Sequence, residues 1–303
     1  MSINSTTYSY ALLILHWKNV DDTLACVDSL LGSVSDSCML YLLCNGSSEG
    51  DNSVIKKKCA SIPFVTIINS EYNRGFAGGS NYLIKTAKEN DHDFYILINN
   101  DTILDRQFVQ KVDRELVAIN DDKIGIFVPT IYYYDSDLSK KNIWRAGDSK
   151  KVLLESNKIK RPVGCIYGIS EKLINKIGYF DENFFAYGEE VDYNYRAKKA
   201  GFSLCYLPKV NAWHKVVEHA DSELKTYLSV RNNYYLYNKR NFLDRYLYFT
   251  YFFIVKLPRK FFLILYKNKK NLPVFFRANK DGLAWIKTGK KPRSDFITET
   301  ERT

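Results

Sequence analysis

Short apolar runs alternate with helix-like segments along the chain, and this alternation is the strongest constraint on the fold. The runs share the length and composition of buried strands and lie at 10–15, 39–44, 65–68, 94–99, 124–129, 165–169 and 202–208. The helix-like segments lie at 21–31, where Asp21 or Asp22 can cap the helix, 51–60 and 76–89. Strands that alternate with helices predict an α/β fold with a mostly parallel sheet flanked by helices.

Three carboxylates, those of Glu189, Glu190 and Asp192, lie within four positions at the predicted start of another helix. A helix N-terminus favours acidic residues because its N–H groups are unpaired and its dipole end is positive, but three exceed what one cap requires. Like charges this close raise one another's pKa values, which suits a general base or a site completed by a cation. The strand at 202–208 then leads to His214, just beyond its end, and a histidine beside an acid cluster is a candidate ligand.

Another candidate acidic residue, Asp101, follows the apolar run FYILI at 94–98. Here Asn99, Asn100 and Asp101 come at the carboxyl end of a predicted buried strand, where ligands of open α/β sheets usually bind. A turn in which Asn and Asp satisfy their own backbone is the structural alternative. Together with the acids at 189–192 and His214, a binding site is the better interpretation.

Five blocks of the sequence resemble, in order, the motifs of family 2 glycosyltransferases with the GT-A fold. The blocks are LILHWKN (13–19), LLCNGS (42–47), NRGFAGGSN (73–81), LINND (97–101) and the stretch 178–214. The last resembles the family's pattern of FDE, ED, an arginine, AG and a closing histidine. The resemblance covers about the first 235 residues. It points to the branch with rhamnosyltransferase-like and galactofuranosyltransferase-like enzymes of bacterial surface polysaccharide assembly, such as O-antigen and capsule.

The resemblance implies an inverting, metal-dependent transfer of a rhamnose- or hexose-type sugar. Glu190 takes the position of the catalytic base, with Glu189 and Asp192 holding donor or acceptor hydroxyls. Asp101 and His214 are implied ligands of Mg²⁺ or Mn²⁺, which stabilises the leaving diphosphate. The donor is expected to be a dTDP- or UDP-linked sugar, and the acceptor a saccharide on a polyprenyl carrier. The implied donor-binding residues are His16, Trp17, Asn19, Cys44, Asn45, Arg74, Gly75, Gly79, Asn99, Asn100, Asp101 and Arg231.

Three positions depart from the family's motifs. Cys44 stands where the family has the aspartate of VDN, which puts base or ribose recognition in question. Asn99 replaces the first aspartate of a DXD element, so Asp101 is the carboxylate left there. Glu190 replaces the usual aspartate and lengthens the base by one methylene, and displacements of about 1 Å matter in catalysis. A catalytically impaired nucleotide-sugar-binding homologue is therefore the alternative function.

Three other classes of protein fit the sequence less well. The glycines at 75, 78 and 79 do not form the GxGxxG of a dinucleotide-binding enzyme. A nucleotidyltransferase would carry a basic glycine-rich loop near its N-terminus, and LHWKNVDD is not one. A membrane-surface scaffold would explain the C-terminal part but not the acid cluster.

The C-terminal part is basic and aromatic. Residues 231–303 contain 17 Lys and Arg against 5 Asp and Glu, a local charge of +12 in a chain whose net charge is +10. Lys256, Pro258, Arg259 and Lys260 interrupt the apolar stretches, which argues against a membrane span. We expect 1–235 to be the catalytic domain, with a nucleotide-sugar half at about 1–105 and an acceptor half at about 106–235. A helical extension at 236–303 would lie on an anionic membrane rather than bind nucleic acid, or would pack as a cap or in a homodimer.

Cysteine usage and the N-terminal sequence indicate the compartment. The six cysteines lack metal-type spacing, and several lie in apolar runs, as free thiols do in a reducing environment. The N-terminus shows no basic leader, and its apolar run is short. A cytoplasmic protein, peripheral to the inner face of the cell membrane, is the expectation.

Overall fold

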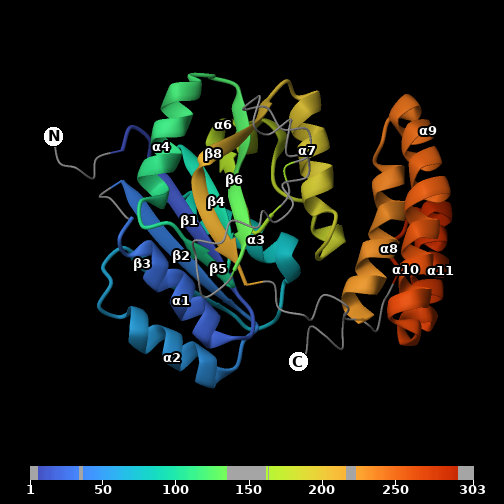
Figure 1. Ribbon diagram of the computed structural model, residues 1–303, viewed down its shortest axis with the longest axis horizontal. Coiled ribbons are helices and arrows are strands. Elements are labelled where there is room, and N and C mark those ends of the chain that lie inside the picture. Colours follow the sequence, from blue (N-terminus) through green and yellow to red (C-terminus); the bar gives the residue numbers. More distant parts are fainter. Residues whose placement is uncertain (1–5, 34–36, 135–161, 163, 216–222, 293–303) are drawn as a thin grey trace. The chain divides into compact units, whose positions relative to one another are not determined.

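The computed structural model describes residues 6–33, 37–134, 162, 164–215 and 223–292 (Figure 1). The chain divides into two compact units. One consists of Met1–Phe180 with Tyr193–Val216, and the other of Asp181–Asp192 with Val217–Thr303. The sequence from 132 to 161 is polar and irregular, which makes it a candidate acceptor-side excursion, and it lies mostly outside the described residues.

The first unit is built on a sheet that has eight strands among the described residues. They are β1 (Tyr10–His16), β2 (Cys38–Asn45), β3 (Val65–Ser70), β4 (Phe94–Asn99), β5 (Thr102–Leu104), β6 (Ile124–Tyr133), β7 (Ile166–Ser170) and β8 (Ser203–His214). Their order is β3-β2-β1-β4-β7-β6-β8-β5. The pairs β3–β2, β2–β1, β1–β4 and β6–β8 are parallel, whereas β7 runs antiparallel to β4 and β6, and β5 antiparallel to β8. The predicted mostly parallel sheet is confirmed.

Helices cover both faces of this sheet (Figure 1). They are α1 (Val20–Leu30), α2 (Glu49–Cys59), α3 (Gly75–Ala87), α4 (Phe108–Ile119), α6 (Glu171–Ile177) and the later part of α7 (Glu189–Lys199). Side chains alternate along a strand, so each strand supplies both faces. In β1, Leu12 and Ile14 join the core under α1, α2 and α4, whereas Ala11 and Leu13 join the core under α3, α6 and α7.

Several details differ from the sequence-based expectations. Asn19, rather than Asp21 or Asp22, caps α1 by accepting a hydrogen bond from the Asp22 backbone N–H. Strand β8 continues through His214 instead of ending at residue 208, because it pairs with β5 as well as β6. Strand β5 and helices α4 and α6 were not predicted.

The second unit is helical, so the predicted helical C-terminal extension is present. Its helices are α8 (Glu223–Asn238), α9 (Phe242–Thr250), a π-helix (Tyr251–Lys256), α10 (Leu257–Lys267) and α11 (Leu272–Thr288), with short 3₁₀ turns at Glu182–Phe184 and Lys269–Asn271. The predicted boundary at 235 falls inside α8. Helices α8 and α11 approach closely, because a Cβ on Gly282 would lie 2.3 Å from the Tyr234 ring. Tyr235 stacks on Trp285 at 4.1 Å between ring centroids.

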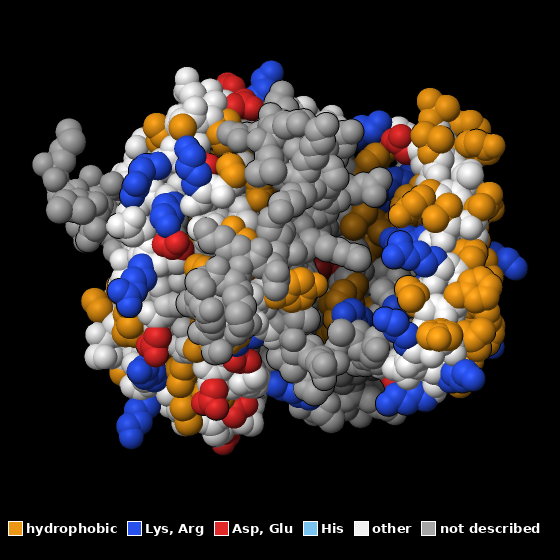
Figure 2. All heavy atoms as spheres, viewed as in Figure 1, with side chains coloured by type: hydrophobic (Ala, Val, Ile, Leu, Met, Phe, Trp, Pro, Cys, Tyr) orange, Lys and Arg blue, Asp and Glu red, His pale blue; other side chains and the backbone are white. Residues whose placement is uncertain are grey.

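The aromatic residues of the second unit divide into two groups. Phe185, Tyr234, Phe252 and Phe275 are buried in a core that belongs to this unit. Others are exposed: Phe242, Tyr246, Phe249, Tyr251, Phe262, Tyr266 and Phe276. Figure 2 shows apolar side chains gathered along these helices with Lys and Arg side chains beside them. The aromatic residues therefore form both an internal core and an exposed surface.

Candidate active site

The carboxyl ends of β1, β2 and β4 meet at one edge of the first unit. The strand register places His16 beside Cys44, and Leu15 beside Asn99. Three of the five sequence blocks therefore come together where parallel strands end, which is the usual ligand side of such a sheet. Cys44 is fully buried, and this burial raises the pKa of its thiol to about 11, so the thiol stays protonated at neutral pH.

Asn45 joins the second block to the glycine block. Its side-chain N–H donates to Asn73 Oδ1 at 2.9 Å, and its Oδ1 accepts from the Arg74 backbone N–H at 2.9 Å. A Cβ on Gly79 would lie 2.5 Å from Leu15, so α3 approaches β1 closely because residue 79 has no side chain. Gly75, at φ +70°, begins α3.

Arg74 stands at this edge with an ordered side chain. Its Nε donates to Ser70 Oγ at 3.0 Å, and its guanidinium lies over the rings of Tyr72 and Tyr82 at 4.6 and 4.5 Å. Stacking between two rings fixes the plane of a guanidinium, the group that matches phosphate geometry. The arrangement holds a positive charge beside the loop at 70–75.

The side chains of His16 and Asn100 both contact the hydroxyl of Thr23. His16 Nδ1 lies 2.7 Å from Thr23 Oγ1, and the Asn100 side-chain N–H donates to the same oxygen at 2.9 Å. His16 is fully buried, and this burial lowers the pKa of its imidazole, so the ring is neutral at pH 7. Next to it, Trp17 has the Lys18 ammonium 4.7 Å from its ring centroid.

Asp101 and His214 are neighbours because β5 and β8 pair. Thr102 faces His214 in the antiparallel register, and the Lys215 backbone N–H donates to the Asp101 carbonyl at 2.9 Å. The pairing brings Asp101 Oδ1 to 3.1 Å from His214 Nε2, with both side chains mostly buried. Two residues that are far apart in sequence thus present a carboxylate and an imidazole at one point.

The acid cluster begins α7 and belongs to the second unit. Glu189 is 5 % exposed, and its Oε2 has no hydrogen-bond partner within the described ranges. Burial raises the pKa of Glu189 to about 7, so the expected increase arises from desolvation rather than from like charges. Glu190 is half-buried, and Asp192 is 1 % exposed. The three adjacent acids therefore occupy different environments.

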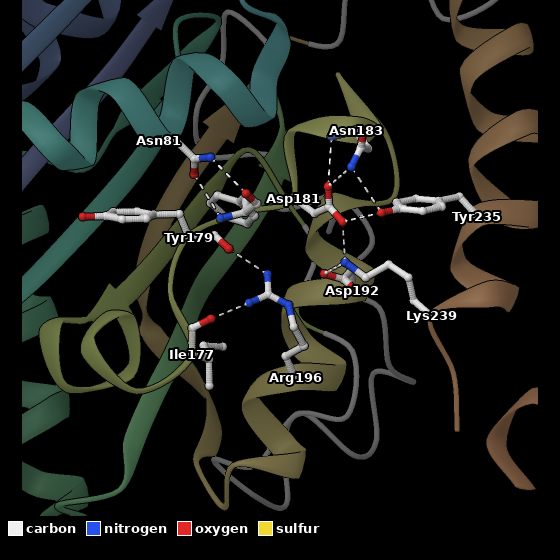
Figure 3. Close-up of polar contacts among 10 residues, drawn as sticks. Asn81, Ile177, Tyr179, Asp181, Asn183, Asp192, Arg196, Tyr235 and Lys239 are labelled. Atoms are coloured by element: carbon white, nitrogen blue, oxygen red, sulfur yellow. Dashed lines mark hydrogen bonds and ion pairs between the residues drawn. The ribbon is translucent and has the colours of Figure 1, made fainter. Parts of the chain in front are cut away.

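Asp192 is held by a lysine that the sequence did not single out (Figure 3). The Lys239 ammonium lies 3.0 Å from Asp192 Oδ2 and 2.6 Å from Asp181 Oδ2. Tyr235 also donates its hydroxyl to Asp181 at 2.7 Å. Although burial acts to raise it, the hydrogen bonds from Lys239 and Tyr235 lower the pKa of Asp181 to about 2. Nothing in the spacing of these residues signals the network, since α8 brings Tyr235 and Lys239 to it.

The loop before α7 is strained and is anchored by Asn232. Phe185 and Tyr187 have φ of +64°, a conformation that is uncommon for residues with bulky side chains. The Asn232 side-chain N–H group donates to the carbonyls of Phe184, Ala186 and Tyr187 at 3.0, 2.8 and 2.6 Å. One side chain thereby fixes the segment that leads into Glu189.

Arg231 is fully buried beside this anchor. Its Nη2 donates to the Phe184 carbonyl at 3.2 Å and to the Asn232 carboxamide at 2.6 Å, and its guanidinium lies 5.3 Å from the Trp285 ring centroid. The Arg-Asn pair noted in the sequence therefore lies against the loop that carries the acids. Whether Arg231 also meets a donor phosphate stays a prediction.

Comparison with known proteins places the chain in a family. Residues 8–233 match the family described as "Glycosyltransferase like family 2". The "Low-salt glycan biosynthesis hexosyltransferase Agl10" of Haloferax volcanii is 25 % identical over 239 residues, covering 74 % of each chain.

Two solved glycosyltransferase structures resemble this one. The mannosyltransferase PcManGT from Pyrobaculum calidifontis, in complex with GDP-Man and Mn²⁺, has a TM-score of 0.57 at 12 % identity, over 98 % of this chain and 84 % of that one. GalNAc-T7 with UDP, GalNAc and Mn²⁺ has a TM-score of 0.61 at 13 % identity, over 97 % of this chain and 59 % of that one. These likenesses confirm the predicted GT-A fold. The family match covers most of the chain, and the protein therefore belongs to glycosyltransferase family 2 and is a glycosyltransferase.

Proposed function

We propose that the protein is an inverting, metal-dependent transferase that moves a sugar from a nucleotide diphosphate to a saccharide hydroxyl. The observation that carries the proposal is the 3.1 Å approach of Asp101 Oδ1 and His214 Nε2, beside the carboxyl ends of the parallel strands. Glycosyl transfer from such a donor needs a positive charge beside the leaving diphosphate.

The donor atoms of Asp101 and His214 fit a divalent cation. Within the described ranges, no group of three or more His, Cys, Asp and Glu side chains forms a complete metal cage. Asp101 would supply a carboxylate and His214 an imidazole, and two protein ligands leave coordination positions for water and diphosphate oxygens. When bound, Mg²⁺ or Mn²⁺ acts as a Lewis acid on the leaving group. The solved relatives PcManGT and GalNAc-T7 both contain Mn²⁺.

The donor lies at the edge formed by β1, β2, β4 and α3. Arg74 offers an oriented guanidinium to a phosphate. Gly75 begins α3 at φ +70°, and the missing side chain of Gly79 lets α3 lie close to β1. His16, Trp17, Asn19, Cys44, Asn45, Asn99 and Asn100 complete the proposed donor-binding set, with Arg231 assigned to it from the motif. A dTDP- or UDP-linked rhamnose or hexose is the proposed donor.

Glu190 is the proposed base that removes the acceptor proton as the hydroxyl attacks the anomeric carbon. It is half-buried, so a substrate hydroxyl can reach it, whereas Glu189 is buried and desolvation raises the pKa of its carboxyl. Asp192 acts through Lys239, which ties the start of α7 to α8. Glu189 and Asp192 are thus proposed to position Glu190 and the substrate hydroxyls rather than to take the proton.

The acceptor is proposed to be a polyprenyl-linked saccharide at the cytoplasmic face of the membrane, in surface polysaccharide assembly. The H. volcanii relative is named for glycan biosynthesis. Support also comes from the +12 charge of residues 231–303 and from the exposed apolar side chains of the described helices α9, α10 and α11. No helix in the described part of the chain has both the length and the apolar character to cross a bilayer.

A nucleotide-sugar screen, with and without Mn²⁺ or Mg²⁺, tests the proposal. We expect one donor to bind in the presence of metal and to be transferred with inversion, and excess chelator to remove activity. Asp101→Ala should weaken donor binding only when metal is present. Full activity in chelator would overturn the metal assignment. Donor binding without transfer to any saccharide would favour the catalytically impaired homologue instead.

A further inference from the structure

A cavity of about 230 Å³ lies within the second unit, next to the loop that carries the acids. Tyr187, Gly188 and Val191 form one side of it, and these residues flank Glu189 and Glu190 in the sequence. Helix α8, the π-helix and α10 supply the other side. The cavity is smaller than pockets that enclose drug-sized ligands, so it suits one part of a larger molecule.

The cavity is apolar inside. Val230, Leu236 and Phe252 are buried side chains that line it, and Leu257 joins them from the start of α10. Such a lining favours hydrocarbon over a sugar ring, because sugar hydroxyls need hydrogen-bond partners when they leave water.

The charged groups that line the cavity, among the described residues, are two lysines. Lys256 is the last residue of the π-helix and Lys260 lies one turn later in α10. The Lys256 ammonium donates to Asn233 Oδ1 at 2.7 Å, and the Tyr248 hydroxyl donates to the same oxygen at 2.7 Å. Lys256 is therefore held in place by a buried amide. A π-helical segment is rare and often occurs at a functional site.

An apolar cavity with two ammonium groups matches an anionic amphiphile. We propose that it binds the phosphate group and the adjoining apolar segment of a lipid-phosphate-linked acceptor, with Lys256 and Lys260 on the phosphate. This assignment rests on the proposed function, because it names the acceptor class of that enzyme. It explains why a basic, apolar cavity shares its wall with the loop before Glu190.

Binding of simple amphiphiles tests the cavity without catalysis. Decyl phosphate and the uncharged decyl β-glucoside are titrated calorimetrically into the full-length protein, below their micelle concentrations. Decyl phosphate should bind at least tenfold more tightly than the glucoside, and more tightly than hexyl phosphate or inorganic phosphate. Lys256→Gln and Lys260→Gln should each weaken the binding of decyl phosphate about tenfold, which corresponds to about 1.4 kcal/mol. Lys267→Gln, at an exposed lysine of α10 outside the cavity, is the matched control.

Four results would overturn the proposal. The first is equal affinity for the charged and uncharged amphiphiles. The second is unchanged decyl phosphate affinity in both variants while thermal melting shows that they are folded. The third is an equal loss of affinity in the control variant. The fourth is that the variants no longer sediment with anionic vesicles but still bind decyl phosphate with unchanged affinity, since the two lysines would then contact the bilayer surface instead.

Transfer assays separate this proposal from the function on which it rests. With a diphosphate-prenyl acceptor, the two variants should raise the acceptor KM about tenfold at unchanged donor KM, whereas an octyl-glycoside acceptor should show no such change. Absence of transfer by the unaltered protein to either acceptor would count against the proposed function. The calorimetric result would still decide whether the cavity binds lipid phosphate.

Discussion

The Lys239 ammonium lies 3.0 Å from the carboxylate of Asp192, which is 1 % exposed at the start of the acid-bearing helix. The same ammonium contacts Asp181, so one lysine directly after α8 neutralises two carboxylates from the segment 181–192. Removing one partner of a buried ion pair leaves an uncompensated charge, which is costly.

Lys239→Met should therefore lower the free energy of unfolding by about 3 kcal/mol. Urea unfolding measures the change, with Lys267→Met as the control at an exposed lysine. Adding Asp192→Asn to Lys239→Met should restore part of the loss. An unchanged urea midpoint in Lys239→Met would show that the pair contributes nothing to stability.

Asn232→Ala should lower kcat about 100-fold with little change in the donor KM. The three carbonyls that Asn232 binds hold a strained loop, and loss of that anchor shifts Glu190, where displacements near 1 Å are costly. Steady-state kinetics over a range of donor concentrations measures it. Asn175→Ala, an exposed amide on α6, is the control. A purely structural role would instead lower thermal stability and leave kcat per folded molecule intact.

Glu189→Gln should change how stability depends on pH. Burial raises the pKa of Glu189 from its ordinary value of 4.5 to about 7 in the folded protein, so the protonated form favours the folded state. That contribution is fully present below about pH 4.5 and is lost as pH rises through about 7. The unaltered protein should thus lose up to about 3 kcal/mol relative to Glu189→Gln between these values. Parallel unfolding-free-energy profiles for the two proteins would contradict the assignment.

Glu190→Gln should abolish transfer while leaving donor affinity within about twofold, because the amide cannot take the acceptor proton. Turnover with the true acceptor and calorimetry with the donor measure the two effects. Glu190→Asp restores the family's usual residue and should keep measurable activity. Near-normal turnover in Glu190→Gln would move the base to Glu189 or Asp192.

The exposed aromatic residues of α10 should hold the protein on anionic membranes. Phe262 and Tyr266 are 64 % and 91 % exposed, so replacing both with serine should leave the core intact and reduce sedimentation with anionic vesicles several-fold. The matched control replaces Val54 and Tyr72, which are exposed on the first unit. High salt should release the unaltered protein, since each basic residue near the surface contributes about 1 kcal/mol. Equal sedimentation of both double variants would assign these residues elsewhere.

Much of the first unit could be predicted from sequence because its signals are local. Buried strands appear in the sequence as apolar runs, Gly79 lies where α3 approaches β1 closely, and Gly75 takes a positive φ at the start of α3. The pairing of β5 with β8 had no such signal, since a three-residue strand is too short to show a period. The cap at Asn19 was missed for a similar reason, because two aspartates follow it.

The site residues in the second unit were harder to find. Lys239 and Tyr235 look like ordinary members of a basic, aromatic helix, and only the fold brings them to Asp181 and Asp192. Arg231 looks like a phosphate ligand, but its burial against the loop is decided by packing with Trp285. Contacts between segments that are distant in sequence leave no periodic pattern.

The family match stops at residue 233, in the middle of α8. The helix continues through Tyr235, which stacks on Trp285 of α11, and ends at Asn238, directly before Lys239. A protein that ended at residue 233 would therefore lose the contacts of Tyr235 and Lys239 with Asp181 and Asp192. It would also lose the stacking of Tyr235 on Trp285. The helices that follow residue 233 therefore help to hold the loop that carries the acids, so replacing them with the corresponding helices of another glycosyltransferase should alter the acceptor side of the enzyme.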